Sequence, residues 1–283
     1  MSIISSVTAE PIRVEMLIDY LKTTTRQHSK QDLDLMFSPP NGKQNEESKT
    51  STFKDVYIVV ESLGLIRVED DVVKSNILNK KTSTLKHIKN TIFAKDFLQK
   101  DNIALAIAWL QTQRSIKPLH WSAKIIDVVN SDLNDNYDGL DLTGTDATRW
   151  RHFGYWCIYL GFATKVSIDG NAYICPDPTE AINNELKDIF SARKELKIKE
   201  FLVTLSSILP VLEEGTIRKK INDSIREGLQ LPENVLSLAT SLALLRLEHR
   251  KVIKLTHKAD ADSVSIQDNN SNHIVSHIEY LGN

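Results

Sequence analysis

The stretch Thr145–Pro178, TDATRWRHFGYWCIYLGFATKVSIDGNAYICPDP, contains the pattern of one complete helix followed by one complete hairpin. Thr145 or Asp146 can cap the helix, because a side-chain oxygen at this position accepts a hydrogen bond from a free backbone amide. Apolar residues then recur at the steps of an amphipathic helix: Phe153, Trp156, Cys157 and Leu160. Gly161 ends this helix, and two extended runs flank Asp169-Gly170, a pair that tolerates the positive φ of a tight turn.

The same order of helix, stop and hairpin occurs twice more. Thr52–Leu63 has an apolar helical face, Gly64 stops it, and a short hairpin follows. Near the end of the chain, Pro232–His249 predicts a strong helix, and Lys251–Leu255 and Ser263–Ile266 predict a hairpin around a polar turn. A helix followed by a two-stranded hairpin is the back half of a winged helix. We therefore predict a mainly α fold with short β-hairpins (α+β), built from tandem winged-helix domains.

The spacing of these units predicts the domain organisation. We assign an N-terminal winged helix to residues 1–78 and a basic helical connector to residues 79–100. A middle winged helix then covers residues 101–178, and a C-terminal winged-helix-like domain covers residues 179–283.

The composition is that of an ordinary soluble globular protein, with 283 residues, 41% hydrophobic and 25% charged. The first residues lack the basic flank and apolar block of a secretory signal, and no apolar run approaches the roughly 20 residues of a membrane-spanning helix. We therefore expect a cytoplasmic protein. The two cysteines, Cys157 and Cys175, are too few for a disulfide framework, and each lies in an apolar pattern where a buried thiol fits.

A net charge of −2 argues against a surface that is basic all over, but it permits a local basic patch. Winged helices place the last helix before the hairpin in the major groove of DNA, so the charge of that helix is informative. Only the middle unit has hydrogen-bond donors clustered in the first turns of this helix: Thr145, Thr148, Arg149, Arg151 and His152. These residues predict a contact with duplex DNA, and a protein interface or a solvated surface are the alternatives.

The basic connector carries lysines that only Asp96 offsets. Such a segment can lie along phosphates and bind nucleic acid without reading its sequence. The candidate phosphate contacts are Lys80, Lys81, Lys86 and Lys89. The alternative is a solvated helix face whose apolar side docks on the next domain.

The candidate recognition helix of the third unit has no basic residue from Val235 to Leu245. Its leucines surround too much of the circumference for one buried stripe, and a helix that is apolar nearly all round must be covered on more than one side. We expect its own domain to cover one side only. The leucines predicted to dock a partner chain, or a second copy of this protein, are Leu236, Leu238, Leu242 and Leu245.

The sequence contains neither a phosphate-binding GxxxxGK[ST] or GxGxxG loop nor a Gly-x-Ser-x-Gly nucleophile turn. His273 and His277 are spaced as two metal ligands on a helix can be, but no third ligand is evident. A pair of surface histidines is the simpler interpretation. We therefore expect a non-enzymatic protein without a cofactor or a metal ion.

Two segments, TDATRWRHFGYWCIYLGFA and LSSILPVLEEGTIRKKI, together with the N-terminal helix-and-wing unit, resemble the DpdG-like proteins found beside DNA-modifying and phage-defence genes in bacteria. The resemblance implies a non-enzymatic subunit of a DNA-defence or DNA-maintenance complex. Its implied partners are an ATPase or a nuclease, with non-specific duplex DNA and self-association as further interactions and no membrane.

In broader architecture, tandem winged helices with neutral recognition helices are similar to the KITE subunits of SMC complexes, whose wings hold protein partners. This chain departs from the usual KITE pattern because it has three units. The alternative function is a sequence-specific winged-helix transcription regulator that reads DNA with the helix starting at Thr145.

Overall fold

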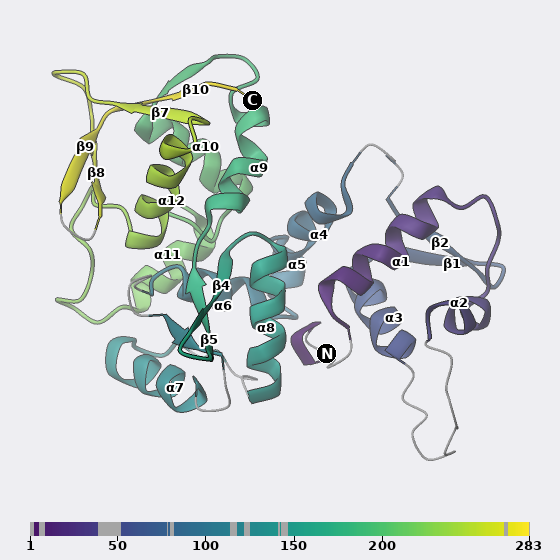
Figure 1. The fold of residues 1–283 in the computed structure, drawn as a ribbon. Coiled ribbons are helices and arrows are strands. Elements are labelled where there is room, and N and C mark those ends of the chain that lie inside the picture. Colours follow the sequence, from purple (N-terminus) through teal and green to yellow (C-terminus); the bar gives the residue numbers. More distant parts are fainter. Residues whose placement is uncertain are drawn as a thin grey trace. The chain divides into compact units, whose positions relative to one another are not determined.

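The computed structural model describes residues 3–5, 9–38, 52–77, 79, 82–113, 118–121, 125–140, 142, 147–268 and 271–282. The chain divides into two compact units, Met1–Ile103 and Ala104–Asn283. Both units are mainly helical with small antiparallel sheets, which confirms the predicted fold class (Figure 1). The predicted division into three winged helices and a connector stays a prediction. The two compact units do not separate the middle winged helix from the C-terminal one.

The described residues of the first unit form a short 3-10 helix at Ile3–Ser5, then three helices, a hairpin and two further helices. Its elements are α1 (Pro11–Thr23), α2 (Lys30–Phe37), α3 (Thr52–Ser62), β1 (Ile66–Glu69), β2 (Val72–Ser75), α4 (Thr84–Ile92) and α5 (Lys95–Leu98). A capping box at Ser29 starts α2, because Ser29 and Asp32 each accept a hydrogen bond from the other's backbone amide.

The basic connector belongs to the first unit. Helix α4 packs against α1, with Ile88 and Ile92 fully buried. The contact also has a polar part, because Lys22 donates to the Thr82 carbonyl at 2.9 Å and Thr84 donates to Asp19 at 2.6 Å. The apolar side of this segment therefore packs on α1 of its own unit, whereas the alternative interpretation of the connector placed it against the next domain.

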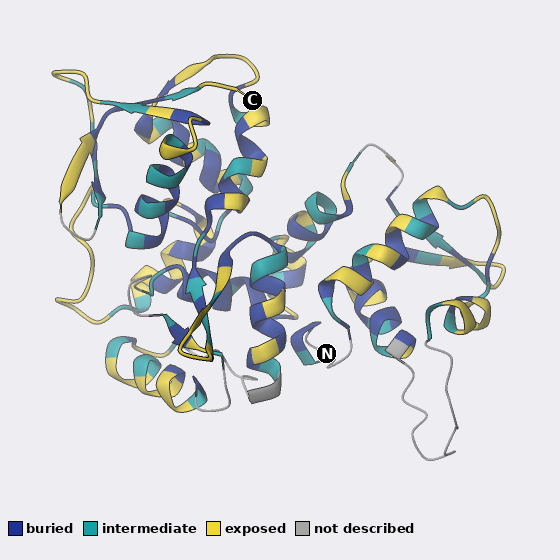
Figure 2. Cartoon of the chain, in the orientation of Figure 1, coloured by how far each residue is buried: buried dark blue, intermediate teal, exposed yellow. Residues whose placement is uncertain are grey.

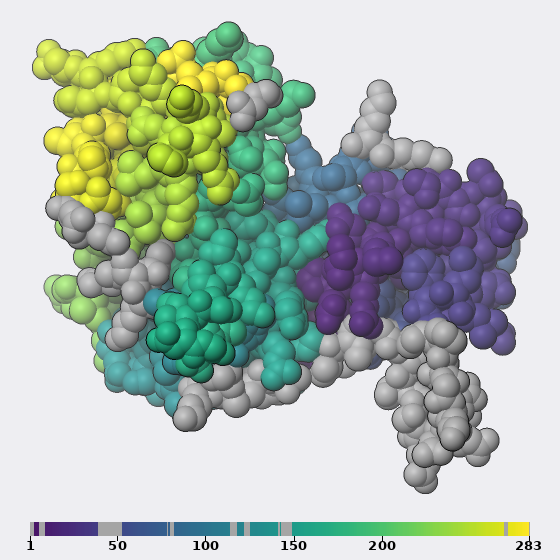
Figure 3. All heavy atoms as spheres, in the orientation of Figure 1, coloured from purple at the N-terminus to yellow at the C-terminus, as the bar shows by residue number. Residues whose placement is uncertain are grey.

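In the described residues, the second unit begins with a helix, a short strand, two helices and a hairpin over residues 163–176, which we call the wing. These elements are α6 (Ile103–Leu110), β3 (Leu119–His120), α7 (Ile125–Asn136), α8 (Ala147–Tyr159), β4 (Ala163–Ile168) and β5 (Asn171–Pro176). The wing strands pair antiparallel from Ala163↔Pro176 to Ile168↔Asn171, and β3 joins the other edge of β5. The wing lies at the surface of this unit, and Ile168 near its tip is 48% exposed (Figure 3).

The remainder of the second unit repeats this order with additions. Its elements are α9 (Thr179–Ile189), β6 (Glu195–Lys197), α10 (Ile198–Ile208), α11 (Thr216–Ser224), α12 (Leu238–His249), β7 (Ile253–Thr256), β8 (Val264–Gln267), β9 (Asn272–Val275) and β10 (His277–Tyr280). The strand order β6-β10-β7 matches β3-β5-β4, because in each sheet the strand before the helices pairs with the last strand of the wing. The two halves of this unit therefore share one topology.

The predicted hairpin of the third unit is wrong in its pairing. Strand β7 pairs with β10, with Ile253 opposite Tyr280, whereas β8 pairs with β9 in a separate hairpin. The polar turn around Lys258–Asp262 therefore leads out of the wing, and the second wing strand is the last strand of the chain. Local alternation predicts that a segment is extended, but it does not determine which segment pairs with it.

The predicted helix Pro232–His249 is also shorter than expected, because α12 begins at Leu238. The residues before it run beside β8, where Leu236 donates to the Ser265 carbonyl at 3.0 Å and Ser265 donates to the Asn234 carbonyl at 2.7 Å. The β8–β9 hairpin thus packs against the start of α12 from its own chain.

The core of the second unit is rich in aromatic residues. Trp109, Trp150, Phe153 and Trp156 are all almost completely buried, and Trp109 and Trp150 meet edge to face at 6.0 Å between ring centroids. Both tryptophans of α8, Trp150 and Trp156, therefore pack in the core of this unit. Burial also raises the pKa of the Cys157 thiol well above its usual value, and Cys175 is half-buried.

Candidate nucleic-acid interface

Helix α8 turns its aromatic side inward and leaves a polar side in solvent (Figure 2). Phe153, Trp156 and Cys157 are fully buried, whereas Arg151 and Tyr155 are exposed. Residues four apart on a helix lie on the same face, so Arg151 and Tyr155 follow one another along the exposed side.

Two further side chains extend this exposed face. The ring of Trp121, which follows β3, meets Tyr155 edge to face with 5.0 Å between centroids. Lys165, on the wing strand β4, places its Nζ atom 4.9 Å from the centroid of the Trp121 ring. We call the row Arg151, Tyr155, Trp121 and Lys165 the aromatic-basic stripe.

Gly154 explains how Trp121 reaches the helix. A Cβ atom at Gly154 would lie 3.0 Å from Cζ2 of Trp121 and 3.4 Å from Cδ1 of Ile174. Because glycine has no Cβ, the indole lies directly against the α8 backbone, beside the ring of Tyr155. In a second aromatic pair, the rings of His120 and Tyr173 meet across β3 and β5 at a tilt of 40°, with 4.3 Å between centroids.

The stripe has two aromatic rings between two cations. A cation at each end can meet a phosphate, and aromatic faces between them can stack on bases or pack on sugars. The cation–π contact between Lys165 and Trp121 also holds the lysine over the ring. This arrangement suits a nucleic-acid backbone that runs across α8 and the wing.

The other residues predicted for this helix have different environments. Arg149 is half-buried, and His152 is only 4% exposed because it lies one helical turn before Trp156, on the buried face. The burial of His152 removes it from the predicted DNA contact. Thr145 lies outside the described residues, and of Thr148 only the helical backbone is described.

The connector lysines are less available than the sequence suggests. Lys86 is half-buried and Lys89 is 3% exposed, because Lys89 follows Ile88 at the edge of the face that packs against α1. Lys89 is therefore not presented to phosphates, contrary to the prediction. Lys80 and Lys81 lie outside the described residues.

The leucines predicted to dock a partner chain are covered more fully than expected. Leu236 is 4% exposed, and its segment lies under β8 of the same chain. The premise that its own domain covers one side only is therefore wrong, because both α9 and β8 pack on α12. Leu238, Leu242 and Leu245 remain half-buried.

A family model described as DpdG-like matches residues 1–261. The chain belongs to the DpdG-like family. This membership associates the protein with bacterial DNA-modification gene clusters. No curated protein and no solved structure matches the chain.

In this DpdG-like protein, sequence analysis missed three of the four stripe residues: Tyr155, Trp121 and Lys165. Tyr155 could have been found, because it lies one helical turn after Arg151 on the polar side of α8. Trp121 could not, because its position depends on how β3 and α8 pack in three dimensions. Lys165 could be placed on the wing, but its contact with Trp121 could not be predicted.

The structure also separates His273 and His277. His273 lies on β9 and His277 on β10, so they do not share a helix face. Among the described residues, no group of three or more His, Cys, Asp or Glu side chains is placed to hold a metal ion. Within the same residues, no helix is long and apolar enough to cross a membrane.

Proposed function

We propose that this DpdG-like protein is a non-enzymatic subunit of a bacterial DNA-defence or DNA-modification system. In this proposal it contacts nucleic acid through the aromatic-basic stripe, and a larger ATPase or nuclease subunit performs the chemistry. The observation that carries the proposal is the stripe itself, which joins α8, the segment after β3 and the strand β4.

The chemistry of the stripe supports contact without sequence reading. Its cations are placed for phosphates, and its aromatic rings have no pattern of donors and acceptors that distinguishes one base from another. Arg151 is the stripe residue best suited to read a base edge, because its planar guanidinium can form two hydrogen bonds with guanine. A DNA contact of this kind would hold the complex on DNA and leave target choice to other subunits.

A direct test measures the affinity of the full chain for a fluorescent duplex of random sequence, by anisotropy, over a range of salt concentrations. The variant is Arg151→Ala/Lys165→Ala, which removes both exposed cations of the stripe. We expect weaker binding and a slope of log affinity against log salt that is less steep by about 1.8, since each lost phosphate contact contributes about 0.9. The control is Lys187→Ala/Lys254→Ala, which removes two exposed lysines elsewhere in the second unit.

Equal affinity and equal salt slope in the stripe variant and the control would refute a DNA role for the stripe. A second duplex, taken from the protein's own promoter region, separates the alternative function. If the stripe variant loses affinity for the promoter duplex alone, the protein is a sequence-specific regulator that uses α8 as its recognition helix.

A further inference from the structure

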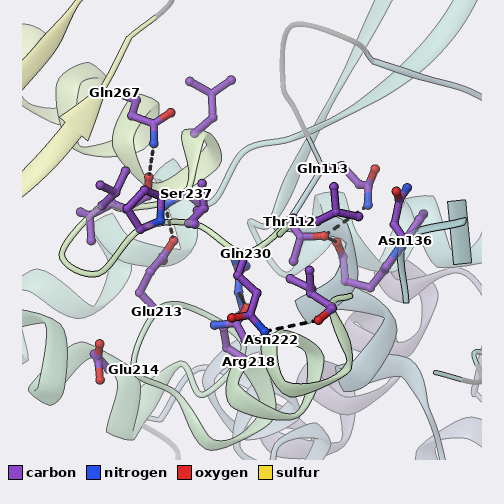
Figure 4. Close-up of a pocket in the computed structure, with 18 of the residues that line it drawn as sticks. Thr112, Gln113, Asn136, Glu213, Glu214, Arg218, Asn222, Gln230, Ser237 and Gln267 are labelled. Atoms are coloured by element: carbon purple, nitrogen blue, oxygen red, sulfur yellow. Dashed lines mark hydrogen bonds between the residues drawn. The ribbon is translucent and has the colours of Figure 1, made fainter. Parts of the chain in front are cut away.

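A groove in the second unit exposes apolar side chains from three separate segments. It has a volume of about 1220 Å³ and is lined by α7, α10, α11 and the segment that leads into α12 (Figure 4). Four large apolar residues that line it are at least half exposed: Val128 (51%), Val203 (60%), Leu229 (54%) and Leu231 (50%). Apolar residues that converge on one groove mark an interaction site more often than scattered ones do.

The charges around this apolar groove are mostly negative. Its acidic lining residues are Asp132, Glu213, Glu214, Asp223, Glu233 and Asp268, whereas its basic ones are Lys199 and Arg218. Arg218 is 3% exposed and donates to Asn222 at 3.1 Å, so its charge is largely withdrawn from the groove surface. Figure 4 shows Glu213 and Glu214 on one side of the groove, and Arg218, Asn222 and Gln230 close together beside them.

Several of these acids are held in place by the chain. Glu213 accepts hydrogen bonds from the Ser237 amide at 2.9 Å and the Thr240 hydroxyl at 2.5 Å. Asp132 accepts from the Trp109 indole at 2.9 Å. Glu214, Asp223 and Glu233 are exposed. Lys219 pairs with Glu214 at 3.6 Å, and Asp223 and Glu233 keep the rim of the groove acidic.

We propose that the apolar groove binds a basic amphipathic segment of a partner protein. Apolar side chains of this segment would pack on Val203, Leu229 and Leu231, and its lysines or arginines would face the acidic rim. The proposal rests on the role of the chain as a subunit and names the surface through which it docks. It does not depend on the stripe, because the groove contains none of the four stripe residues.

The charge of the groove selects this occupant over the others. Nucleic acid would be repelled by the exposed acids, and an apolar small molecule would leave the acidic rim unmatched. A second copy of this chain is the remaining occupant, and the experiment tests for it separately.

The experiment places a photo-crosslinking amino acid at Val203 in the full chain, in its native cells, with Leu281 as the control site. Leu281 is 46% exposed and does not line the groove. We expect a crosslink at Val203 alone, to a peptide with a net positive charge and apolar residues three and four apart. No crosslink, an acidic peptide, equal crosslinking at both sites, or a crosslink to a second copy would each overturn the proposal.

The crosslinked peptide is then synthesised and titrated against purified full-length variants. Val203→Asp and Leu231→Asp should each weaken its binding by about tenfold or more, because a contact residue becomes charged, while Leu281→Asp should bind like the wild type. The triple variant Glu214→Gln/Asp223→Asn/Glu233→Gln should lose the salt dependence of binding. Unchanged binding in the groove variants would overturn the proposal.

The same variants distinguish a failure here from a failure of the proposed DNA contact. Val203→Asp should bind random duplex DNA like the wild type, and Arg151→Ala/Lys165→Ala should bind the peptide like the wild type. If Val203→Asp lost both activities, the substitution would have damaged the fold, and the neutralised triple variant would then decide the outcome for the groove.

Discussion

Gly64 and Gly161 occupy equivalent positions, because each ends a helix that leads into a wing and each has a positive φ, 62° and 85°. Their surroundings differ. A Cβ atom at Gly64 would meet nothing within 4 Å, whereas at Gly161 it would lie 2.7 Å from the backbone nitrogen of Ala181. That nitrogen donates to the Gly161 carbonyl at 3.1 Å, so the turn after α8 rests directly on the start of α9. Gly161→Ala must push these two segments apart, and Gly64→Ala does not.

The two substitutions share one cost and differ in another. Each puts an alanine in the left-handed region, which costs roughly 1–2 kcal/mol. Only Gly161→Ala adds a backbone clash, and overpacking costs typically about 1–3 kcal/mol. We therefore expect Gly161→Ala to lower the free energy of unfolding by about 3 kcal/mol, and Gly64→Ala by about 1 kcal/mol. With a urea dependence of about 2 kcal/mol/M, the midpoint for Gly161→Ala falls by about 1.5 M.

Urea denaturation monitored by two probes separates the two units. All four tryptophans, at positions 109, 121, 150 and 156, lie in the second unit, so tryptophan fluorescence reports the unfolding of that unit. Circular dichroism reports both units. Gly161→Ala should lower the urea midpoint of the fluorescence change. Gly64→Ala should leave that midpoint unchanged and lower the midpoint of the part of the dichroism change that comes from the first unit. A fluorescence shift for Gly161→Ala no larger than the dichroism shift for Gly64→Ala would refute the close-contact argument.

Three further outcomes follow from single contacts. Gly215→Ala should lower the fluorescence midpoint further still, because a Cβ there would lie 2.2 Å from the Pro210 carbonyl oxygen; a shift no larger than that of Gly161→Ala would count against this. Cys157 should not react with a thiol reagent such as DTNB until the second unit unfolds, because it is fully buried and burial raises its pKa; fast labelling of the native chain would contradict this. Hydrogen bonds from Ser29 lower the pKa of Asp32, so its ionised form stabilises the first unit above the unfolded pKa of about 4, and this contribution is lost as the pH falls through the folded value. The dichroism midpoints of the wild type and Asp32→Asn should therefore differ at neutral pH and converge in acid, and a difference that is constant with pH would contradict this.

Local patterns determined the helix and the hairpin of the first two predicted helix-and-hairpin units. The apolar spacing from Phe153 to Leu160 and the stop at Gly161 predict α8 and its end, because helix periodicity and a positive φ are properties of neighbouring residues. The Asp169-Gly170 turn predicts the β4–β5 hairpin for the same reason. Helix α9 was missed, although Ile182 and Leu186 lie four apart and both are fully buried.

The candidate interface was predictable only in part. Arg151 was identified because an exposed arginine in the first turns of a recognition helix follows from helix phase. His152 was assigned to the wrong face, because the phase that buries Trp156 also buries the residue one turn before it. Trp121 joins the interface through space, since only the packing of β3 on α8 at Gly154 brings its ring beside Tyr155.

The sequence by itself determined the first two helix-and-hairpin units, their glycine stops and the aromatic core of α8, because each depends on residues within a few positions of one another. Only the tertiary structure decided that β7 pairs with β10 and that the β8–β9 hairpin packs on α12. It also decided that Val128, Val203 and Leu231 converge on the apolar groove with its acidic rim. These features join segments that are far apart in the chain. Their energies come from packing and strand pairing between distant residues, which a local pattern does not encode.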